Sequence, residues 1–343
     1  MTGGAVDATI LIATFNRAAL LDDTLRSVRA LHVSPARTWD VMVVDNNSTD
    51  NTHAVVERHA REFPVPLRYV FEARQGRSSA LNAGITRSTG EVIAFTDDDV
   101  RLDPQWLDAA CDELTGTDQS IGYVGGPVRP IWEAPPPRWL DLTRGDLWGT
   151  IAIQDHGSVR AIYEEARKVP LGANMAVRRA MITRIGGFRA DLGRSSGRLI
   201  LGQEVPELLV RARTAGFRGV YQPAMALSHH VPARRLTRTY FRRWWFGKGV
   251  SRAALERTQS ITDMGLDLSK VSRLLNVPRP MYGSAVRHVR DWLADTLRGR
   301  SAAAFRHEMM LRYFAGYFWA SQKRSGAGAE HDLGPHSDAV TAR

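Results

Sequence analysis

The sequence predicts an α/β fold in which a mainly parallel, Rossmann-like sheet is flanked by helices and followed by a helical C-terminal extension. Short apolar runs alternate with amphipathic stretches from Ala8 to Thr96, carboxylates follow two of the runs directly, and the pattern is mostly helical from Leu236 onward. Strands that alternate with helices favour a parallel sheet covered on both faces. A chain of 343 residues is long enough for one large α/β unit with a smaller appendage.

Four strands and three helices are expected in the first part of the chain. The apolar runs that predict strands are 8–13, 39–44, 67–71 and 92–95, and the stretches with helical spacing are 17–31, 51–61 and 78–86. Ser48, Thr49 and Asp50 stand directly before the second helix and are typical of an N-cap cluster.

The regular alternation is lost beyond Asp99. Helices are expected at 104–114, 178–184 and 204–215, and strands at 174–177, 219–221 and 225–228. The Pro- and Trp-rich segment 131–148 predicts an irregular loop, the Gly- and Ser-containing segment 193–202 a mobile one, and the polar tail 325–343 disorder.

Net charge and cysteine content limit the class of protein. A formal charge of +10 favours nucleic acid, anionic lipid or phosphorylated substrates as partners. The single cysteine, Cys111, excludes an intrachain disulfide and favours a reducing compartment. The residues before Ala8 hold no apolar segment of a secretory signal, and no run reaches the roughly 18 apolar residues that span a bilayer. We therefore expect a cytoplasmic protein, with a peripheral position on the inner face of the membrane as the alternative.

Three consecutive carboxylates form the strongest chemical signal. Asp97, Asp98 and Asp99 follow the strand expected at 92–95, so they lie at its carboxyl end, where ligands bind in open α/β sheets. Carboxylates at alternate positions can share one hard cation such as Mg²⁺ or Mn²⁺, which keeps waters and is completed by substrate phosphates. A solvated acidic turn is the alternative interpretation.

Polar residues also follow the first two strands. Asp45 ends the second strand and faces the same crevice, where a carboxylate can accept hydrogen bonds from a base or from ribose hydroxyls. Thr14, Asn16 and Arg17 lie between the first strand and the first helix, whose backbone N–H groups can meet a nucleotide. Neither a P-loop nor a dinucleotide fingerprint is present, which counts against ATPases and dehydrogenases.

These motifs, taken in order, resemble family 2 glycosyltransferases with the GT-A fold. The resemblance covers roughly 8–249 and rests on the segments ATFNR, VVDNNSTDNT, GRSSALNAGI, FTDDDVRLDPQWL, GANMAVRR, GGF, GQEVPELLVRARTAG and HHVP. It implies an inverting, metal-assisted transfer of a sugar from a nucleotide-diphosphate sugar to a hydroxyl of a glycan, glycolipid or polysaccharide, with a glycan or lipid-linked acceptor as partner. It also implies a GT-A domain at 1–232, divided into a nucleotide-binding half at about 8–100 and an acceptor half at about 101–232, before a helical region at 233–324.

Carried over position by position, the resemblance implies a donor site. The residues implied to contact the nucleotide sugar are Thr14, Asn16, Arg17, Asp45, Arg77, Asn82, Asp97 and Asp98. The residues implied to meet the metal, Mn²⁺ or Mg²⁺, are Asp99 and Asp97 together with His229 or His230.

The resemblance places the catalytic base at the start of the helix expected at 204–215. Where the family has a Glu-Asp pair, this sequence has Glu204 followed by Val205, so Glu204 and Glu207 are both candidates. Glu204 opens the helix, whose N-terminus stabilises an anion, and it follows a loop that could close over the donor. Glu207 equally suits a structural salt bridge with Arg211, four residues on.

A second unusual region lies at 234–252. It holds seven basic residues, five aromatic residues and no acidic residue. On a helix this composition suits an anionic membrane surface. The aromatic side chains could instead dock on the catalytic domain while the arginines are solvated or grip a diphosphate. Single-stranded nucleic acid is a weaker alternative.

Sequence features distinguish a glycosyltransferase from two competing functions. A sugar nucleotidyltransferase would show a Gly-rich, Arg-containing loop after the first strand, and ATFNR is not such a loop. A non-enzymatic module that binds nucleic acid or a membrane surface could use the basic C-terminal third. Carboxylates at the ends of two strands would repel phosphates without a metal, so we do not expect nucleic acid as a partner.

Overall fold

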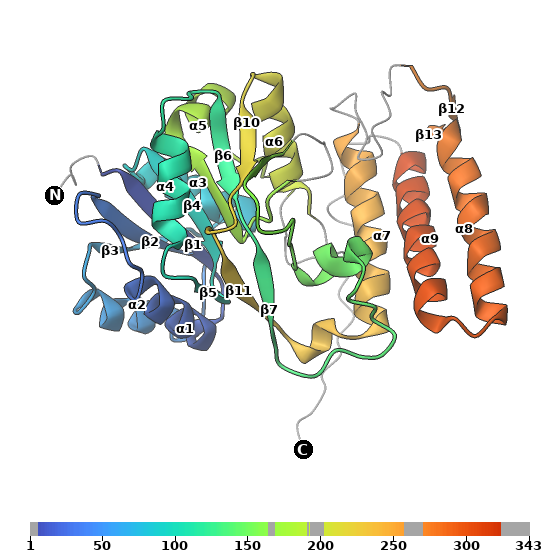
Figure 1. The fold of residues 1–343 in the computed structure, drawn as a ribbon, viewed down its shortest axis with the longest axis horizontal. Coiled ribbons are helices and arrows are strands. Elements are labelled where there is room, and N and C mark those ends of the chain that lie inside the picture. The colour runs from blue at the N-terminus through green and yellow to red at the C-terminus, as the bar shows by residue number, and fades with distance from the viewer. Residues whose placement is uncertain (1–5, 164–168, 191, 193–201, 257–269, 324–343) are drawn as a thin grey trace.

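A mixed eight-stranded sheet lies at the centre of the computed structural model, which describes residues 6–163, 169–190, 192, 202–256 and 270–323 (Figure 1). Its strands, in spatial order, are β3 (Leu67–Phe71), β2 (Trp39–Asp45), β1 (Ala8–Thr14), β4 (Val92–Asp97), β9 (Asn174–Arg178), β6 (Ile121–Gly125), β10 (Arg218–Tyr221) and β8 (Ala161–Ile162). The first four are parallel, and β9 runs antiparallel to both β4 and β6.

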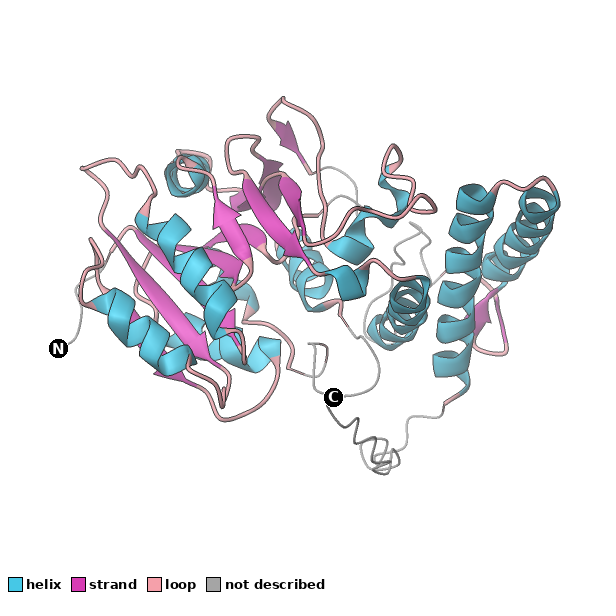
Figure 2. Cartoon of the chain, turned by 90° about the horizontal axis from the view of Figure 1, so that it is seen from below, coloured by secondary structure: helices cyan, strands magenta, loops and turns pink. Residues whose placement is uncertain are grey.

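Helices and a second, small sheet cover the two faces of this sheet (Figure 2). The helices are α1 (Ala18–Arg29), α2 (Thr52–Ala60), α3 (Arg77–Arg87), α4 (Trp106–Thr115), α5 (Arg179–Ile185) and α6 (Glu204–Thr214). The small sheet has the order β5 (Val100–Leu102), β11 (Leu227–Val231) and β7 (Val128–Trp132). Because β5 begins three residues after β4 ends, the acidic segment between them is held at the junction of the two sheets.

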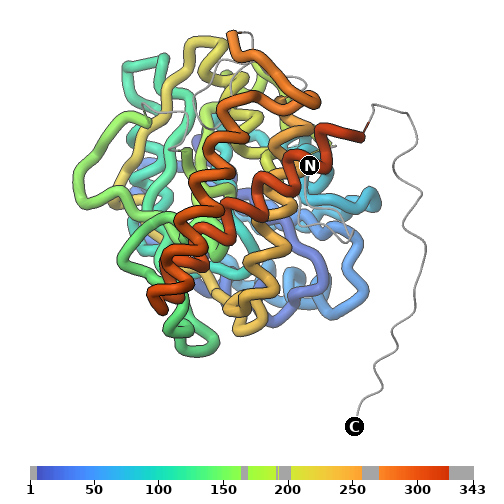
Figure 3. Tube along the Cα trace, turned by 90° about the vertical axis from the view of Figure 1, so that its right-hand side faces the viewer, coloured from blue at the N-terminus to red at the C-terminus, as the bar shows by residue number. Residues whose placement is uncertain are grey.

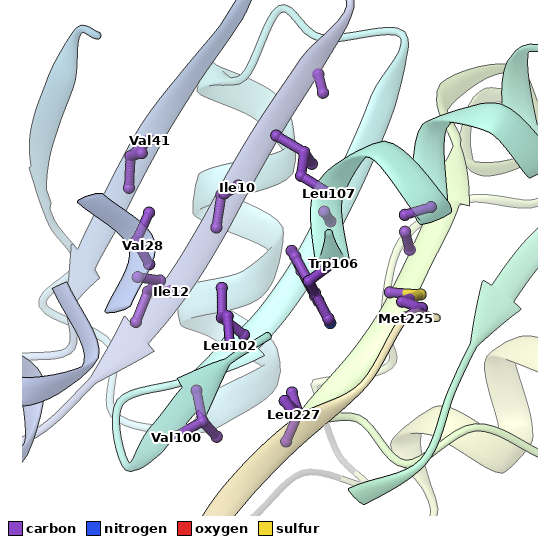
Figure 4. Close-up of a cluster of buried hydrophobic side chains, with 14 of the residues drawn as sticks. Ile10, Ile12, Val28, Val41, Val100, Leu102, Trp106, Leu107, Met225 and Leu227 are labelled. Carbon is purple, nitrogen blue, oxygen red and sulfur yellow. The ribbon is translucent and has the colours of Figure 1, made fainter. Parts of the chain in front are cut away.

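The pleat of the central strands divides their side chains between two hydrophobic clusters. Ile10 and Ile12 of β1 point to one face, where they join a cluster with Leu102 of β5 and Trp106 of α4 (Figure 4). Leu11 points to the other face and joins a second cluster with residues of α3, α5 and α6. Burial on both faces explains why the strands read as continuous apolar runs.

The C-terminal region forms a helical layer with its own hydrophobic cluster. After the short 3₁₀ segments at Gly145–Ile151 and Ala233–Arg235 come α7 (Arg238–Leu255), the hairpin of β12 (Arg273–Leu274) and β13 (Val277–Pro278), α8 (Arg279–Leu297) and α9 (Ser301–Gln322). In the helical layer α9 packs against both α7 and α8, so α8 is the outermost helix (Figures 1 and 3). No helix in the described ranges is long and apolar enough to cross a membrane.

The structure favours docking for the aromatic residues of 234–252. Phe241 is fully buried and Trp245 is 7% exposed, and both belong to the C-terminal cluster. The indole N–H of Trp245 donates to Thr150 Oγ1 at 3.0 Å, and Arg242 is paired with Glu308 of α9. These contacts hold α7 against the rest of the chain, so its buried face is not available to a membrane.

The predicted fold class is confirmed, with differences in detail. The strands β5, β6, β7, β8, β12 and β13 are absent from the prediction, and the strand expected at 225–228 is β11, which begins at Leu227. The segment 131–148, expected to be irregular, contains the end of β7 and the start of a 3₁₀ helix. The mobile loop expected at 193–202, except Gly202, and the tail at 325–343 lie outside the described residues.

Candidate functional site

A cavity of about 470 Å³ opens at the carboxyl ends of β1 and β4. Its wall combines residues from the two strand ends, from the starts of α3 and α6, from β11 and from the C-terminal region. The charged and metal-ligating side chains among them are Arg17, Arg77, Asp97, Asp98, Asp99, Glu204, His229, Arg235 and Lys248. Thr14 also lines the cavity, as do Phe15, Asn46, Gln75 and Trp244.

Asp98 is turned inward and anchors the first βα loop. Its Oδ2 accepts from the Thr14 hydroxyl at 2.8 Å, and its Oδ1 accepts from Arg17 Nη1 at 2.9 Å. Burial raises the pKa of Asp98 to about 6, although the charge of Arg17 acts in the opposite direction. Asp98 therefore serves to hold Arg17 and β1 in place.

Asp99 presents one carboxylate oxygen that lacks a hydrogen-bond donor. Its Oδ2 accepts from Arg17 Nη1 at 2.8 Å, whereas its buried Oδ1 has no hydrogen-bond partner among the described residues. His229 Nε2 lies 3.5 Å from this Oδ1. Because buried polar atoms are nearly always paired, this oxygen marks a place for a cation or a donor group.

His229 reaches this place from β11 and suits metal ligation. It is 2% exposed, and burial lowers the pKa of its imidazole, which favours the neutral form that ligates metals. Arg235 Nη1 lies 3.5 Å from the same Nε2 atom. A cation next to Asp99 would take the Nε2 lone pair of the neutral ring in place of the Arg235 guanidinium.

The donor set fits a hard divalent cation that is completed by a ligand. The described residues contain no group of three or more acidic, cysteine or histidine side chains that is ready to hold a metal. Asp99 and His229, with Asp97 in the same wall, would supply two or three oxygen and nitrogen ligands. Mg²⁺ in particular keeps several waters and takes its remaining ligands from substrate phosphates, so a partial set of this kind is sufficient.

Arg77 joins the acidic segment to the start of α6. Its Nη2 donates to Asp97 Oδ1 at 2.8 Å and to the carbonyl of Gly172 at 3.0 Å, and its Nη1 lies 3.3 Å from Glu204 Oε1. Glu204 opens α6 and lines the cavity at 8% exposure. Gln203 before it has a φ of 107°, a strained conformation of the kind found at functional sites.

Glu207 points away from the cavity wall. Both of its carboxylate oxygens accept from Arg211, at 2.9 and 2.8 Å, and Arg211 in turn donates to the carbonyl of Gly187 at 2.7 Å. Glu207 thus ties α6 to the end of α5, which is the structural role that its spacing from Arg211 predicts.

The structure places four other predicted contact residues outside the cavity wall. Asp45 accepts from the Tyr69 hydroxyl at 2.7 Å and from the Ser48 backbone N–H, and it is 2% exposed. Asn82 makes two hydrogen bonds to the backbone of Phe188, so it holds the loop that follows α5.

Asn16 and His230 are the other two. Asn16 accepts from the Thr49 backbone N–H at 2.7 Å and so links the loops after β1 and β2. His230 follows His229 in β11, so its side chain leaves the opposite face of the strand, while its backbone N–H donates to the Asp99 carbonyl at 2.8 Å. Of the two histidines, His229 is therefore the one that reaches the cavity.

Several wall residues are not anticipated by the sequence. Asn46 accepts from the Gly76 backbone N–H at 2.8 Å and donates to the Arg74 carbonyl at 2.7 Å, so it shapes the turn that presents Arg77. Its position directly after Asp45 is a signal that could have indicated this role. Trp244 and Lys248 are four residues apart on α7, a spacing that places them on one helix face.

The charges in the cavity wall are balanced. The four carboxylates Asp97, Asp98, Asp99 and Glu204 face the four basic side chains Arg17, Arg77, Arg235 and Lys248. A doubly ionised diphosphate and a divalent cation also sum to zero. The wall, whose formal charges sum to zero, therefore suits the diphosphate and the cation bound together better than either of them bound alone.

Comparison with known proteins assigns the N-terminal half of the chain to a protein family. Residues 9–180 match the family described as Glycosyl transferase family 2. The succinoglycan biosynthesis protein ExoM of Rhizobium meliloti is 27% identical over 245 residues, which cover 71% of this chain and 73% of that protein. The glucosyl-dolichyl phosphate glucuronosyltransferase of Haloferax volcanii is 23% identical over 243 residues, which cover 70% and 74% respectively.

A solved structure confirms the architecture. A mannosyltransferase from Pyrobaculum calidifontis, in complex with GDP-Man and Mn²⁺, is similar with a TM-score of 0.59 at 17% identity. The similarity covers 93% of this chain and 88% of that one, so it extends beyond the central sheet into the C-terminal helices.

Proposed function

Because the chain belongs to glycosyl transferase family 2 and is a glycosyltransferase, we propose that it transfers a sugar with inversion from a nucleotide-diphosphate sugar to an acceptor hydroxyl. One observation carries the proposal. The Oδ1 atom of Asp99, which has no hydrogen-bond partner among the described residues, lies 3.5 Å from the Nε2 atom of His229 in a cavity whose wall also holds Glu204.

The donor diphosphate would bind beside Asp97 and Asp99. A divalent cation held by Asp99 and His229, Mn²⁺ or Mg²⁺, would supply Lewis-acid stabilisation of the charge that the departing diphosphate gathers. Arg17, Arg77 and Arg235 border the same space and would donate hydrogen bonds to phosphate oxygens. Phe15 follows β1 and Asn46 follows β2, and both line the cavity, where they would border the nucleoside.

Glu204 would act as the general base. It accepts the proton of the acceptor hydroxyl while that oxygen forms a bond to the anomeric carbon, and the bond from the anomeric carbon to the diphosphate oxygen breaks on the opposite side. The leaving nucleoside diphosphate takes the bonding electrons, and a single displacement of this kind inverts the anomeric centre. Arg77, which contacts both Glu204 and Asp97, would fix the distance between the base and the leaving group.

The acceptor is proposed to be a glycan or a lipid-linked saccharide. A relative whose name specifies a dolichyl phosphate sugar supports a lipid-linked acceptor. A protein that modifies such an acceptor would work at the cytoplasmic face of a membrane, which fits the net charge of +10.

The substitution Asp99→Asn tests the metal-dependent part of the proposal. It removes a charge from the atom pair that would hold the cation, so the affinity for UDP, GDP or dTDP in the presence of Mn²⁺ should fall at least about tenfold. In EDTA the variant and the parent should bind the nucleotide equally. Isothermal titration calorimetry measures both conditions.

The exposed carboxylate of Asp112 on α4 provides the matched control. Asp112→Asn should leave nucleotide binding unchanged under both conditions. Equal affinity of the Asp99→Asn variant and the parent in Mn²⁺ would remove the proposed role of Asp99.

A further inference from the structure

Exposed apolar side chains are concentrated in the C-terminal helical layer. Of the eleven large hydrophobic side chains that are exposed in the described part of the chain, eight lie between residues 270 and 323. Four of these eight are on α8, the outermost helix: Val286, Val289, Leu293 and Leu297, with exposures of 68%, 42%, 48% and 87%. A globular surface rarely gathers apolar residues in one place without a partner.

The four side chains of α8 form one continuous stripe. Their spacing of three, four and four residues places them on a single helix face. From Val286 to Leu297 the stripe extends for about 16 Å along the helix. Because α9 covers the other side of α8, which is the outermost helix (Figure 3), and because the four side chains are exposed, this face points away from the rest of the described chain.

Arginine residues border the stripe. Arg290 lies four residues after Val286 and Arg279 seven residues before it, so both share the apolar face, and Arg287 lies at its edge. Residues 279–300 hold five arginines and two aspartates. One aspartate, Asp295, turns toward α9, where it lies 3.6 Å from His307.

We propose that this face of α8 lies on an anionic lipid surface, with the stripe in the interfacial region and the arginines on the lipid headgroups. A helix with an apolar face and bordering arginines is the pattern of interfacial membrane binding. A second copy of the chain fits less well, because two such faces would bring their arginines together. The face is separate from the cavity, so the proposal does not depend on the donor chemistry.

The structure favours α8 over the basic segment 234–252 as the part of the chain that contacts a membrane. Its aromatic side chains are committed to internal contacts, with Trp245 buried and Trp244 in the cavity wall. The surface that remains available for lipid is on α8, two helices further out (Figure 1).

Vesicle flotation of the full chain tests the proposal. Vesicles of phosphatidylcholine mixed with phosphatidylglycerol should carry the protein upward, and vesicles of phosphatidylcholine alone should carry at least about tenfold less. The combined change Val286→Ser, Val289→Ser, Leu293→Ser and Leu297→Ser should lower binding to the anionic vesicles by at least about tenfold. The pair Arg279→Gln and Arg287→Gln should have a similar effect and should also weaken the salt dependence.

A matched control is available at two exposed apolar residues outside the C-terminal layer. Phe71→Ser with Val159→Ser should leave vesicle binding at the parental level, since these side chains are 51% and 73% exposed in the N-terminal region. All changed residues are solvent-exposed, so melting temperatures and UDP binding should match the parent and show that the variants are folded.

Three results would overturn the proposal. The parent could fail to bind the anionic vesicles, or the stripe variant could bind as tightly as the parent. Alternatively, light scattering could show that the stripe change converts a parental dimer into a monomer while vesicle binding stays the same, which would assign the face to a second copy.

Discussion

Arg17 holds the two buried carboxylates at the strand end. Its Nη1 atom lies 2.9 Å from Asp98 Oδ1 and 2.8 Å from Asp99 Oδ2, and the two neighbouring carboxylates raise the pKa of its guanidinium. A cation bound at Asp99 would compete with Arg17 for the same carboxylate. A donor diphosphate would offer Arg17 another anion, so donor binding should relieve this competition and favour the cation.

The substitution Arg17→Gln should therefore change metal and nucleotide binding in opposite directions. Without the guanidinium, the affinity for Mn²⁺ alone should rise about tenfold, because like-charge repulsion at this site is lost. The affinity for UDP in Mn²⁺ should fall, because a charged donor to phosphate is missing. Calorimetric titrations of Mn²⁺ with and without UDP measure both changes.

Arg26 of α1 supplies the control for this test. It is paired with Asp22 on the exposed side of α1, so Arg26→Gln should leave both affinities unchanged. Unaltered Mn²⁺ affinity in the Arg17→Gln variant would show that the guanidinium does not oppose the cation.

The two glutamates of α6 should respond differently to substitution. Glu204→Gln keeps the shape of the cavity but removes the base, so turnover should fall by about two orders of magnitude or more while donor affinity is preserved. Glu207→Gln breaks the pair with Arg211 and should chiefly lower the melting temperature. Steady-state kinetics with a nucleotide sugar and thermal unfolding separate the two effects. The reverse result would place the base one helical turn further along α6.

At the residue scale, the sequence predicted contacts between residues of one helix better than contacts between residues of different elements. The salt bridge between Glu207 and Arg211 follows from a four-residue spacing and is confirmed. The choice between His229 and His230 depends on the phase of β11, which is set by pairing with β5 and β7 and is not encoded in the histidine pair itself. Arg235 approaches His229 only because a 3₁₀ turn follows β11, and no spacing rule indicates that contact.

At the scale of elements, prediction succeeded where a segment is long and locally patterned. Strands β1 to β4 each contain a run of mostly apolar residues, and they match the expected ranges within two residues. Strands β5 and β8 have three and two residues, so they are too short to carry a pattern and exist because distant segments pair with them.

Asn174 shows how distant contacts fix the sheet. It begins β9 and is fully buried, and its side chain bonds Trp106 of α4 and the carbonyls of Pro127 and Met225. A single polar residue thus joins three segments that are far apart in the sequence. The local pattern predicts the strand but not these partners.

Two glycines allow α7 and α9 to approach closely. A Cβ atom at Gly316 would lie 2.1 Å from the Phe246 carbonyl oxygen, and one at Gly249 would lie 2.0 Å from the Tyr313 carbonyl oxygen. Backbone atoms cannot move aside as a flexible side chain can, so each glycine is required for this packing distance.

The substitution Gly316→Ala should consequently lower the free energy of unfolding by about 1–3 kcal/mol, because α7 and α9 must separate to admit the methyl group. Gly283→Ala on α8 is the matched control, since the nearest atom to its Cβ is the end of Arg287 at 3.9 Å. In the control, better helix propensity should raise the free energy of unfolding by up to about 1 kcal/mol. Urea denaturation measures both, and equal stability of the two variants would contradict the close packing.

On the scale of the whole molecule, the cavity is built by both parts of the chain. The loop after β1, the end of β4 with the loop that follows it, and the starts of α3 and α6 supply the carboxylates and the first two basic residues, and the segment after β11 adds Arg235, Trp244 and Lys248. Composition indicated a basic and aromatic C-terminal region, but it left docking and membrane binding open. The choice between docking and membrane binding depends on which face of α7 is buried in the C-terminal hydrophobic cluster. Contacts with α9 and with Thr150 define that face. The C-terminal region is thus part of the site and not an independent module.

This arrangement makes a prediction for the two neighbouring arginines that follow β11. Arg235 is 7% exposed and lines the cavity beside His229, whereas Arg234 is exposed. Arg235→Gln removes one of the four basic side chains that balance the carboxylates, so the affinity for UDP in Mn²⁺ should fall about tenfold, as expected for the loss of a charged hydrogen bond. Arg234→Gln changes the net charge of the protein equally and should leave the affinity at the parental level. If both variants lost affinity to the same extent, the effect would come from the overall field of the basic region, and the C-terminal region would not contribute a specific contact to the donor site.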